Sequence, residues 1–126
     1  LISKKMINNK YGRIVNIGSI FSSISKEKRA SYSSSKFGLI GLTKSSAHDL
    51  ANRGILVNAV SPGFVKTSLT KKILSGKEIR KLSSAIPMKR MAIPKEITSC
   101  VLFLSSSENT YITGQNVIID GGFSSK

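Results

Sequence analysis

Three short apolar runs rich in β-branched side chains stand out along the chain. They cover residues 14–17, 55–60 and 116–119, and each is followed by a polar segment that contains glycine. Runs of this length and composition are typical of strands that are buried on both faces of a sheet. The pattern therefore predicts three buried strands.

The segments between these runs have apolar positions at helical spacing. Residues 1–10 are typical of the last turns of a helix, and residues 31–54 predict a long helix that ends at a glycine. The apolar positions of this long helix are Phe37, Ile40, Ala47, Leu50 and Ala51. A proline at the first helical position and an acidic residue in the first turn predict another helix over residues 94–106.

Two polar segments interrupt the alternation of strands and helices. The serine-rich residues 18–30 indicate a loop with a functional role, and the basic, weakly helical residues 68–90 predict a mobile flap. The alternation itself favours an α/β fold in which crossover helices join parallel strands. Because three strands make a small sheet, we expect a partner half that these 126 residues do not contain.

Composition limits where the chain can work. Its 126 residues are 40% hydrophobic and 21% charged, as in a folded domain of modest size. The longest apolar runs are far shorter than the roughly 20 residues that cross a bilayer, and no signal peptide opens the sequence. The single cysteine, Cys100, excludes an internal disulfide and fits a reducing compartment. We expect a cytoplasmic protein that binds no metal and enters no membrane.

The charge of the chain is strongly positive. Twenty Lys and Arg residues against six Asp and Glu residues give a net charge of +14. Such a charge often marks nucleic-acid binding, but here the basic residues are scattered and no aromatic residues interleave with them. Two interpretations stay open: lysines spread over solvated faces, or a surface that attracts an anionic substrate or cofactor. We do not expect nucleic acid as a partner.

The sharpest chemical feature is the segment Tyr32-Ser33-Ser34-Ser35-Lys36. Positions four apart on a helix project from the same face, so the phenol and the ammonium group should lie side by side. A phenol has a pKa of about 10, and a nearby cation favours the phenolate and brings that pKa toward the working range of an acid/base group. Such a pair could give a proton to the alkoxide that forms when a carbonyl accepts hydride. The spacing alone favours the simpler interpretation, an amphipathic tyrosine that covers the edge of the core beside a solvated lysine.

Ser19 is a second candidate, thirteen residues before the tyrosine (32 − 19) and just beyond a buried strand. The carboxyl ends of parallel strands face the crevice in which ligands bind, so its hydroxyl could hold a substrate oxygen. Ser22, Ser23 and Ser25 lie in the same loop and compete for this role.

Four motifs, in this order and spacing, resemble the short-chain dehydrogenase/reductases. They are Gly12-Arg13-Ile14-Val15-Asn16-Ile17-Gly18-Ser19, Tyr32-Ser33-Ser34-Ser35-Lys36, Asn58-Ala59-Val60-Ser61-Pro62-Gly63, and residues 111–122 from Tyr-Ile-Thr-Gly to Asp-Gly-Gly. The sequence is most similar to the 3-oxoacyl-(acyl carrier protein) reductase type. The resemblance spans nearly the whole chain and implies that residues 1–126 are the C-terminal half of a Rossmann-like, doubly wound parallel sheet, with the N-terminal dinucleotide-binding half absent.

The resemblance also implies roles for individual residues. Tyr32 would be the proton donor or acceptor, Lys36 would assist it and bind the nicotinamide ribose, and Ser19 would hold the substrate carbonyl oxygen. The segment that follows the second strand resembles the one that meets the nicotinamide in this family. Its implied cofactor-binding residues are Pro62, Gly63, Val65 and Thr67, in addition to Tyr32 and Lys36. Pro62 and Gly63 also fit an ordinary turn after a strand.

Some features of the family are not in this sequence. No glycine-rich turn matches the pyrophosphate site, and no residue can be assigned to the adenosine ribose, so the cofactor is expected to be NAD or NADP without distinction. The family has a fourth catalytic residue, an asparagine on the preceding helix, and Asn8 and Asn9 lie too close to the strand to be that residue.

Two functions from different classes follow. The first is an NAD(P)-dependent oxidoreductase that interconverts a small-molecule carbonyl and a secondary alcohol, with a tyrosine as general acid/base. The second is a non-catalytic, truncated remnant that acts at most as an oligomerising or anion-binding module. In the family, the helix that carries Tyr32 packs against a second subunit, which implies a homodimer or homotetramer for the intact protein.

Overall fold

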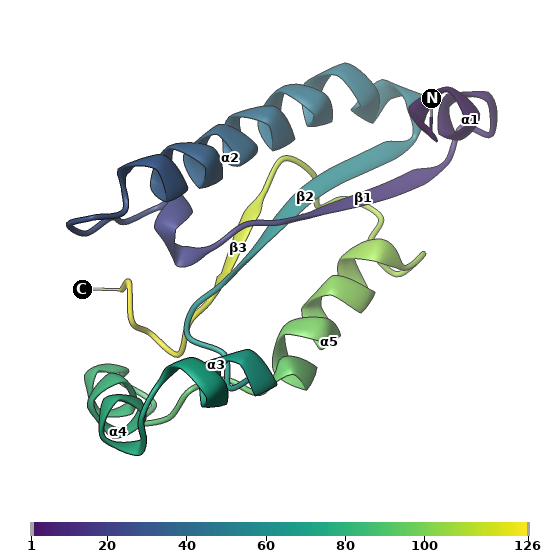
Figure 1. Ribbon diagram of the computed structural model, residues 1–126. Helices are drawn as coiled ribbons and strands as arrows, with labels where there is room; N and C mark the ends of the chain where they lie inside the picture. Colours follow the sequence, from purple (N-terminus) through teal and green to yellow (C-terminus); the bar gives the residue numbers. More distant parts are fainter. Residues whose placement is uncertain (1, 126) are drawn as a thin grey trace.

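A three-stranded parallel sheet lies between helices in the computed structural model, which describes residues 2–125 (Figure 1). The strands are β1 (Gly12–Ile17), β2 (Ile55–Pro62) and β3 (Asn116–Ile119), in the order β1-β2-β3. The register pairs Gly12 with Ile55 and Ala59 with Asn116. The predicted α/β fold with parallel strands and crossover helices is therefore confirmed.

Helices cover the two faces of this sheet. Figure 1 shows α2 on one face and α5 on the other, while α3 and α4 lie beyond the end of β2. The α-helices are α1 (Ile2–Asn8), α2 (Ala30–Leu50), α3 (Ser68–Ile73), α4 (Gly76–Ala85) and α5 (Pro94–Ser105). Two 3-10 turns, η1 (Ile20–Ser22) and η2 (Ala51–Arg53), flank α2 in sequence. These bounds agree with the predicted elements to within a few residues, and Leu1 lies outside the described residues.

The central strand β2 forms the core of the molecule. The side chains of Ile55, Val57, Ala59 and Val60 are almost completely buried. Ile55 and Val57 pack against Ala47 of α2. Burying a Val or Ile side chain contributes about 1.5–3 kcal/mol, so β2 fixes the position of the elements on both sides of it.

The long helix α2 buries part of its predicted apolar face, because Ala47 belongs to the core cluster and Leu50 packs against it. It also buries polar residues that the apolar spacing does not indicate. Its buried residues are Ser33, Thr43 and Ala47, whereas Phe37 is 47% exposed. Thr43 tolerates burial because its hydroxyl donates to Leu39 O (2.7 Å) and accepts from the Asn16 amide (2.9 Å). Small side chains on this face let the helix approach the sheet closely, which the spacing of large apolar residues could not predict.

The segment predicted as a weakly helical flap contains two well-capped helices. Thr67 caps α3 by accepting from Thr70 N (3.1 Å), and Ser75 caps α4 by accepting from Glu78 N (3.3 Å). The Glu78 carboxylate in turn accepts from Ser75 N (2.8 Å), which completes a capping box. These caps explain how a polar sequence forms helices here, and the mobility of the segment stays a prediction.

Candidate active site

Ser19 lies directly beyond the carboxyl end of β1. The parallel ladder continues through Gly18, whose N–H donates to Val60 O (2.7 Å), and Ser19 then caps η1. Its side chain is buried, and its Oγ accepts from Phe21 N (3.2 Å). Within residues 2–125 the hydroxyl proton of Ser19 has no acceptor, so it is free to donate to a ligand oxygen.

The competing serines of this loop are engaged with the protein instead. Ser22 Oγ donates to Ser19 O (2.6 Å) and lies 3.0 Å from Ser61 Oγ, and Ser25 Oγ lies 2.8 Å from Ser33 Oγ. Ser23 Oγ accepts a longer bond from the Asn116 amide (3.4 Å). The geometry therefore favours Ser19 as the serine that meets a ligand.

Tyr32 and Lys36 lie side by side on the first turns of α2. Lys36 Nζ is 5.8 Å from the centre of the Tyr32 ring, as the four-residue spacing predicted, and the ring is 42% exposed. The Phe21 ring stands edge-on to the Tyr32 ring, with 6.0 Å between their centres. Because Phe21 belongs to the turn that Ser19 caps, Ser19, Tyr32 and Lys36 are gathered at one end of the sheet.

The ammonium group of Lys36 has a fixed anchor. It donates to Ile17 O, the last carbonyl of β1, over 3.0 Å. An ammonium group has three protons, so this bond leaves two for a phenolate or a ligand hydroxyl. The anchor holds the lysine over the end of β1, whereas an ordinary solvated lysine would be free to turn away.

Gly63 occupies a position that admits no side chain. Its N–H donates to Ile119 O (2.9 Å), which keeps the segment after β2 alongside β3. A Cβ at this position would lie 2.7 Å from Asp120 Cβ and 2.8 Å from Asp120 Cα. Gly63 is therefore required by its close approach to Asp120, which only the folded chain shows, and it remains compatible with the turn expected from the sequence.

Val65 and Thr67 follow in an extended segment that pairs with Ala92. Lys66 N donates to Ala92 O (2.8 Å) and Ala92 N donates to Phe64 O (2.9 Å), so the N–H of Val65 points the other way. Val65 N–H has no acceptor in the described part of the chain, whereas Val65 O accepts from Thr67 N (3.1 Å) and from the Thr70 hydroxyl (2.8 Å).

The hydroxyl of Thr67 is only partly occupied. Thr67 Oγ1 accepts one bond, from Thr70 N, and lies 2.9 Å from Thr70 Oγ1. Because the Thr70 hydroxyl donates to Val65 O, Thr67 keeps a lone pair for a further donor. The segment therefore offers one free donor at Val65 and one free acceptor at Thr67.

Asp120 closes the loop after β3. Burial raises the pKa of its carboxyl group, but hydrogen bonds from the Ser124 hydroxyl and from the N–H groups of Ser124, Gly122 and Phe123 outweigh that effect and lower the pKa overall. The Ser124 hydroxyl lies 2.6 Å from the carboxylate. Asp120 is thus an ionised group that organises its own loop beneath Gly63.

A buried polar network behind the site could not be predicted from the sequence. Asn116 of β3 accepts from Ser61 Oγ (2.6 Å), and its amide donates to Ser22 Oγ (3.3 Å). Both serines are almost fully buried. The network ties η1, and with it Ser19, to β2 and β3, so these residues are positioning residues for the site.

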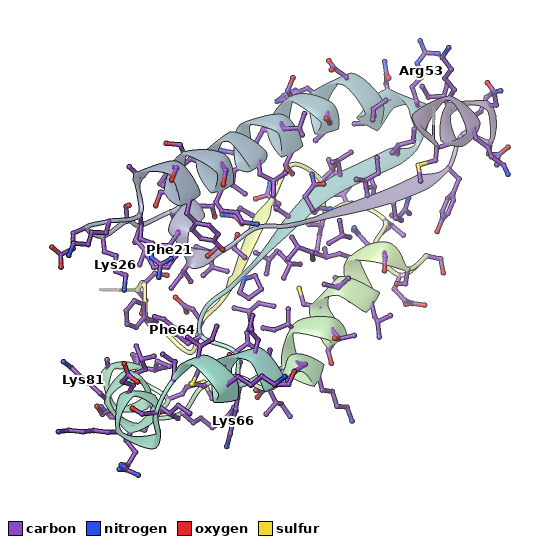
Figure 2. All side chains as sticks on the ribbon, in the orientation of Figure 1. Phe21, Lys26, Arg53, Phe64, Lys66 and Lys81 are labelled. Atoms are coloured by element: carbon purple, nitrogen blue, oxygen red, sulfur yellow. The ribbon has the colours of Figure 1, made fainter. Side chains whose placement is uncertain are left out.

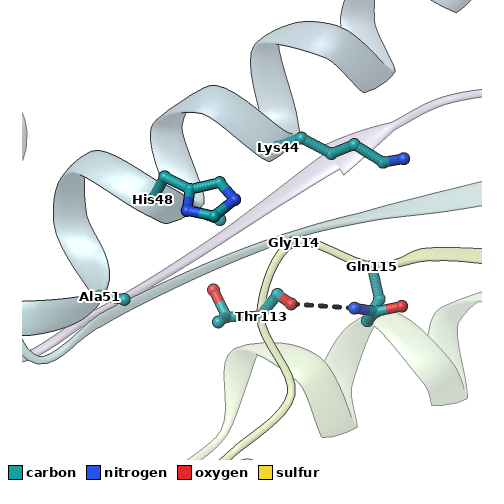
Figure 3. A pocket seen from close by; sticks show the side chains of 7 residues that line it. Lys44, His48, Ala51, Thr113, Gly114 and Gln115 are labelled. Carbon is teal, nitrogen blue, oxygen red and sulfur yellow. Dashed lines mark hydrogen bonds between the residues drawn. The ribbon is translucent and has the colours of Figure 1, made fainter.

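Two cavities lie at opposite ends of the strands. One, of about 450 Å³, opens between the loop around Lys26, Phe64 and the α3–α4 segment, on the side of the molecule shown with Phe21, Lys26 and Phe64 in Figure 2. The other, of about 400 Å³, lies between the end of α2 and residues 113–115 (Figure 3). Ligands of parallel sheets bind at the carboxyl ends of the strands, which favours the first cavity as the functional one.

The second cavity offers little chemistry. His48 and Lys44 border it without an acidic partner among its lining residues. The hydrogen bond drawn in Figure 3, from the Gln115 amide to Thr113 O (3.2 Å), is local to the turn. Among the described residues, no group of three or more His, Cys, Asp or Glu side chains could hold a metal ion. Nor is any described helix long and apolar enough to cross a membrane.

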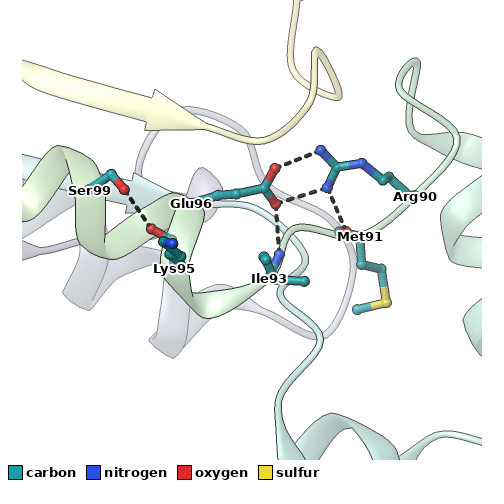
Figure 4. Close-up of polar contacts among 6 residues, drawn as sticks. All are labelled: Arg90, Met91, Ile93, Lys95, Glu96 and Ser99. Carbon is teal, nitrogen blue, oxygen red and sulfur yellow. Dashed lines mark hydrogen bonds and ion pairs between the residues drawn. The ribbon is translucent and has the colours of Figure 1, made fainter.

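An ion pair fixes the point at which the α3–α4 segment joins α5. Arg90 donates through both terminal nitrogens to the Glu96 carboxylate, over 2.6 and 2.8 Å (Figure 4). Glu96 also accepts from Ile93 N (2.8 Å) at the start of α5. The hydrogen bonds from Arg90 first, and then that from Ile93, lower the pKa of Glu96 to about 2.

Comparison with known proteins gives the same family from sequence and from structure. A family model described as enoyl-(acyl carrier protein) reductase matches residues 2–124. The 3-oxoacyl-[acyl-carrier-protein] reductase FabG of Buchnera aphidicola subsp. Schizaphis graminum is 48% identical over 96% of this chain and 49% of its own length. That of Rickettsia felis is 44% identical over 94% of this chain and 49% of its own length. The chain spans about half the length of these relatives.

Solved structures also superpose closely on the chain. ElxO with NADP bound matches with a TM-score of 0.92 and 36% identity, over 98% of this chain and 50% of that one. A gluconate 5-dehydrogenase from Burkholderia cenocepacia, in complex with NADP and tartrate, matches with a TM-score of 0.90 and 29% identity, over 98% and 49%. Together with the family model, these matches show that the chain belongs to the short-chain dehydrogenase/reductase family.

Proposed function

We propose that this chain supplies the catalytic part of an NAD(P)-dependent oxidoreductase that interconverts a carbonyl compound and a secondary alcohol. The observation that carries the proposal is the anchored pair of Lys36 and the half-exposed Tyr32 beside Ser19, at the carboxyl end of β1. A proton donor, a cation and a free hydroxyl at one ligand-facing edge suit proton transfer to a developing alkoxide.

Each of the three side chains has a separate task in this proposal. The Tyr32 phenol gives its proton to the carbonyl oxygen during reduction and takes it back during oxidation. Lys36 stabilises the phenolate through the protons that the bond to Ile17 O leaves free. Ser19 donates its uncommitted proton to the same substrate oxygen and so holds it toward Tyr32.

The segment after β2 fits a nicotinamide group. Its carboxamide needs one donor and one acceptor, which the free N–H of Val65 and the free lone pair of Thr67 would provide. Gly63 leaves room beside them because no side chain separates the segment from Asp120. When bound, a nicotinamide cofactor supplies or accepts the hydride. Relatives in complex with NADP and with NADH support either form of the cofactor.

A second half would complete the cofactor site. In the described residues β1 pairs with β2 alone and leaves one edge without a partner. We infer that a dinucleotide-binding half continues the sheet at this edge and holds the pyrophosphate, for which residues 2–125 offer no glycine-rich turn. A carbonyl or alcohol of small size is the substrate in this proposal.

Replacing Tyr32 by Phe tests the proposal. The variant should lose about 10²–10⁴-fold in kcat for NADPH- or NADH-dependent ketone reduction, because only the proton-transfer group is removed. Cofactor affinity, measured by fluorescence titration, should stay close to that of the unmodified protein. Tyr111→Phe is the matched control, since Tyr111 is 94% exposed and lies far along the chain from the site. Near-normal turnover in Tyr32→Phe, or no turnover in any form of the protein, would contradict the proposed function.

A further inference from the structure

The 450 Å³ cavity beside the candidate site has a largely apolar wall. Leu69 and Ile73 lie one turn apart on α3 and are 63% and 67% exposed, which is unusual for large aliphatic side chains unless a ligand or a partner covers them. Phe64, Leu74, Leu82 and Met91 complete the apolar lining. A wall of this kind suits a ligand with an aliphatic part.

Two cations border the same cavity at its other end. Lys26 Nζ lies 6.0 Å and Arg29 Cζ lies 5.9 Å from the centre of the Phe21 ring, so both cations contact the same aromatic ring. Phe21 in turn contacts the ring of Tyr32. Through Phe21, this arrangement links the two cations to the group that we propose as the proton donor.

Neither Lys26 nor Arg29 forms an ion pair within the described residues. The residues that line the cavity include no Asp or Glu. In the part of the chain that the structure describes, the one ion pair is Arg90–Glu96. Glu27 is the nearest acid in sequence; it lines a neighbouring depression together with Lys26, Lys28 and Arg29 but does not line this cavity. A positive end that is flanked by an apolar wall attracts an anion more strongly than cations in open solvent do.

We propose that Lys26 and Arg29 are specificity-determining residues that select a ketone substrate carrying both an acidic group and an aliphatic chain. The acidic group, a carboxylate or a phosphate-type group, binds to Arg29 through paired N–H donors and to Lys26 as a point charge. The aliphatic chain lies against the α3 wall. This inference rests on the proposed function for the reaction and adds the chemical class of the substrate.

Matched substrates and variants test the inference. The substrates are 3-oxooctanoate, its methyl ester, and the phosphonate in which a phosphonic acid replaces the carboxylic acid. The Lys26→Gln, Arg29→Gln double variant should lose about tenfold in kcat/KM for the acid substrates, mainly through KM, and should keep its activity on the neutral ester. Lys28→Gln is the control, because Lys28 belongs to the same loop but does not line the cavity. Comparison of the two acids tells a carboxylate site from a phosphate-type site.

A binding measurement separates this inference from the proposed reaction. Octanoate and 1-octanol contain no reducible carbonyl, and their binding is measured by calorimetry without cofactor. Octanoate should bind more tightly than octanol to the unmodified protein, and the double variant should lose that difference while Lys28→Gln keeps it. If the ester is reduced but neither measurement distinguishes acid from neutral ligand, the inference is wrong and the proposed function stands. If octanoate binding depends on the two cations but no ketone is reduced, the anion site stands and the redox role falls.

Discussion

The ammonium group of Lys36 donates to the backbone of a strand, whereas that of Lys89, the other described lysine with a backbone acceptor, donates to Ser84 O of a helix. The same group lies close to the Tyr32 ring, so one side chain is anchored to the sheet and remains directed at the candidate proton donor. A lysine held in this way keeps its charge at a fixed place, and preorganised charge contributes most to stabilising a transition state.

Replacing Lys36 by Ala should therefore affect two kinetic constants. The loss of a cation beside the phenol should lower kcat, and the loss of free donors should raise KM for NADPH, because both tasks fall on the same ammonium group. Steady-state kinetics with varied cofactor checks this expectation. Lys44→Ala is the control, since Lys44 lies two turns further along the same helix and borders the other cavity. A change in KM with an unaltered kcat would remove Lys36 from the proton-transfer step.

A second prediction for a single residue concerns Glu96 and the dependence of stability on pH. Its pKa in the folded protein is lowered to about 2, below the usual value of 4.5. The carboxylate should therefore stabilise the fold above about pH 4.5, and this contribution should be lost as the pH falls toward 2. In Arg90→Gln the pKa of Glu96, followed by NMR titration, should rise toward 4.5, because the hydrogen bonds from the Arg90 guanidinium, which lower this pKa most, are removed. Arg53→Gln, far from the ion pair, should leave the titration unchanged.

The placement of single candidate residues could be predicted from the sequence, while their roles in the site stay predictions. The four-residue spacing places Tyr32 and Lys36 on one helix face whatever the rest of the fold does, and Ser19 follows a recognisable strand. The bond between Asn116 and Ser22 could not be predicted, because the two residues are 94 positions apart and each is an ordinary polar residue in its own segment. They come together only because β1 pairs with β2 and β2 pairs with β3.

The contact between Gly63 and Asp120 operates at the scale of elements. It joins the segment after β2 to the loop after β3, and both segments flank the place proposed for the nicotinamide. Because the nearest atoms to an added Cβ include backbone, neither element can yield by a side-chain rotation. The position of the free Val65 N–H thus depends on how closely two loops approach.

Gly63→Ala should lower stability by about 1–3 kcal/mol, because the new methyl group forces these loops apart. The melting temperature should fall, and NADPH affinity should fall with it, since Val65 moves with Gly63. Gly76→Ala is the matched control. The nearest atom to a Cβ at Gly76 is the end of the flexible Arg80 side chain, 3.6 Å away. Equal melting temperatures for the two variants would show that the loops tolerate separation.

The sequence predicted the bounds of the helices and strands well, but it did not predict which of their side chains are buried. Gly54 ends the α2–η2 unit in a left-handed conformation (φ 75°), as a glycine after a helix indicates. On α2, the predicted positions Ala47 and Leu50 pack on the core, but Phe37 is 47% exposed. The helix instead buries Ser33 and Thr43, which its apolar spacing did not indicate. Burial of this kind is a property of two packed elements, which the sequence of one does not contain.

At the scale of the whole molecule, the outer face of α2 remains open. Phe37 and Leu42 are half-exposed or more, and a Cβ added at Gly38 or Gly41 would meet no atom within 4 Å. This open face belongs to the helix that carries Tyr32, and the expectation from the sequence is that this helix packs against a second subunit. We therefore expect the protein to self-associate through α2.

Gly41→Glu should weaken that self-association without lowering the melting temperature, because the new carboxylate points into open space within the monomer. Sedimentation velocity at several protein concentrations measures the effect. Lys77→Gln makes the same change in net charge on α4 and should leave the association intact. A monomer at every concentration, already in the unmodified protein, would contradict the expectation.

The central place of β2 also governs the order in which the site can form during synthesis. The helix turn with Tyr32 and Lys36 leaves the ribosome before β2 exists, and β2 is the one strand of residues 2–125 that pairs with β1. The close approach of Gly63 to Asp120 and the hydrogen bond from Asn116 to Ser22 can form only after β3 has been synthesised. The site consequently forms late, through contacts between residues that are far apart in sequence, and this carries a high entropic cost of loop closure. In a nascent chain, Tyr32 and Lys36 are exposed long before the segments around them have formed.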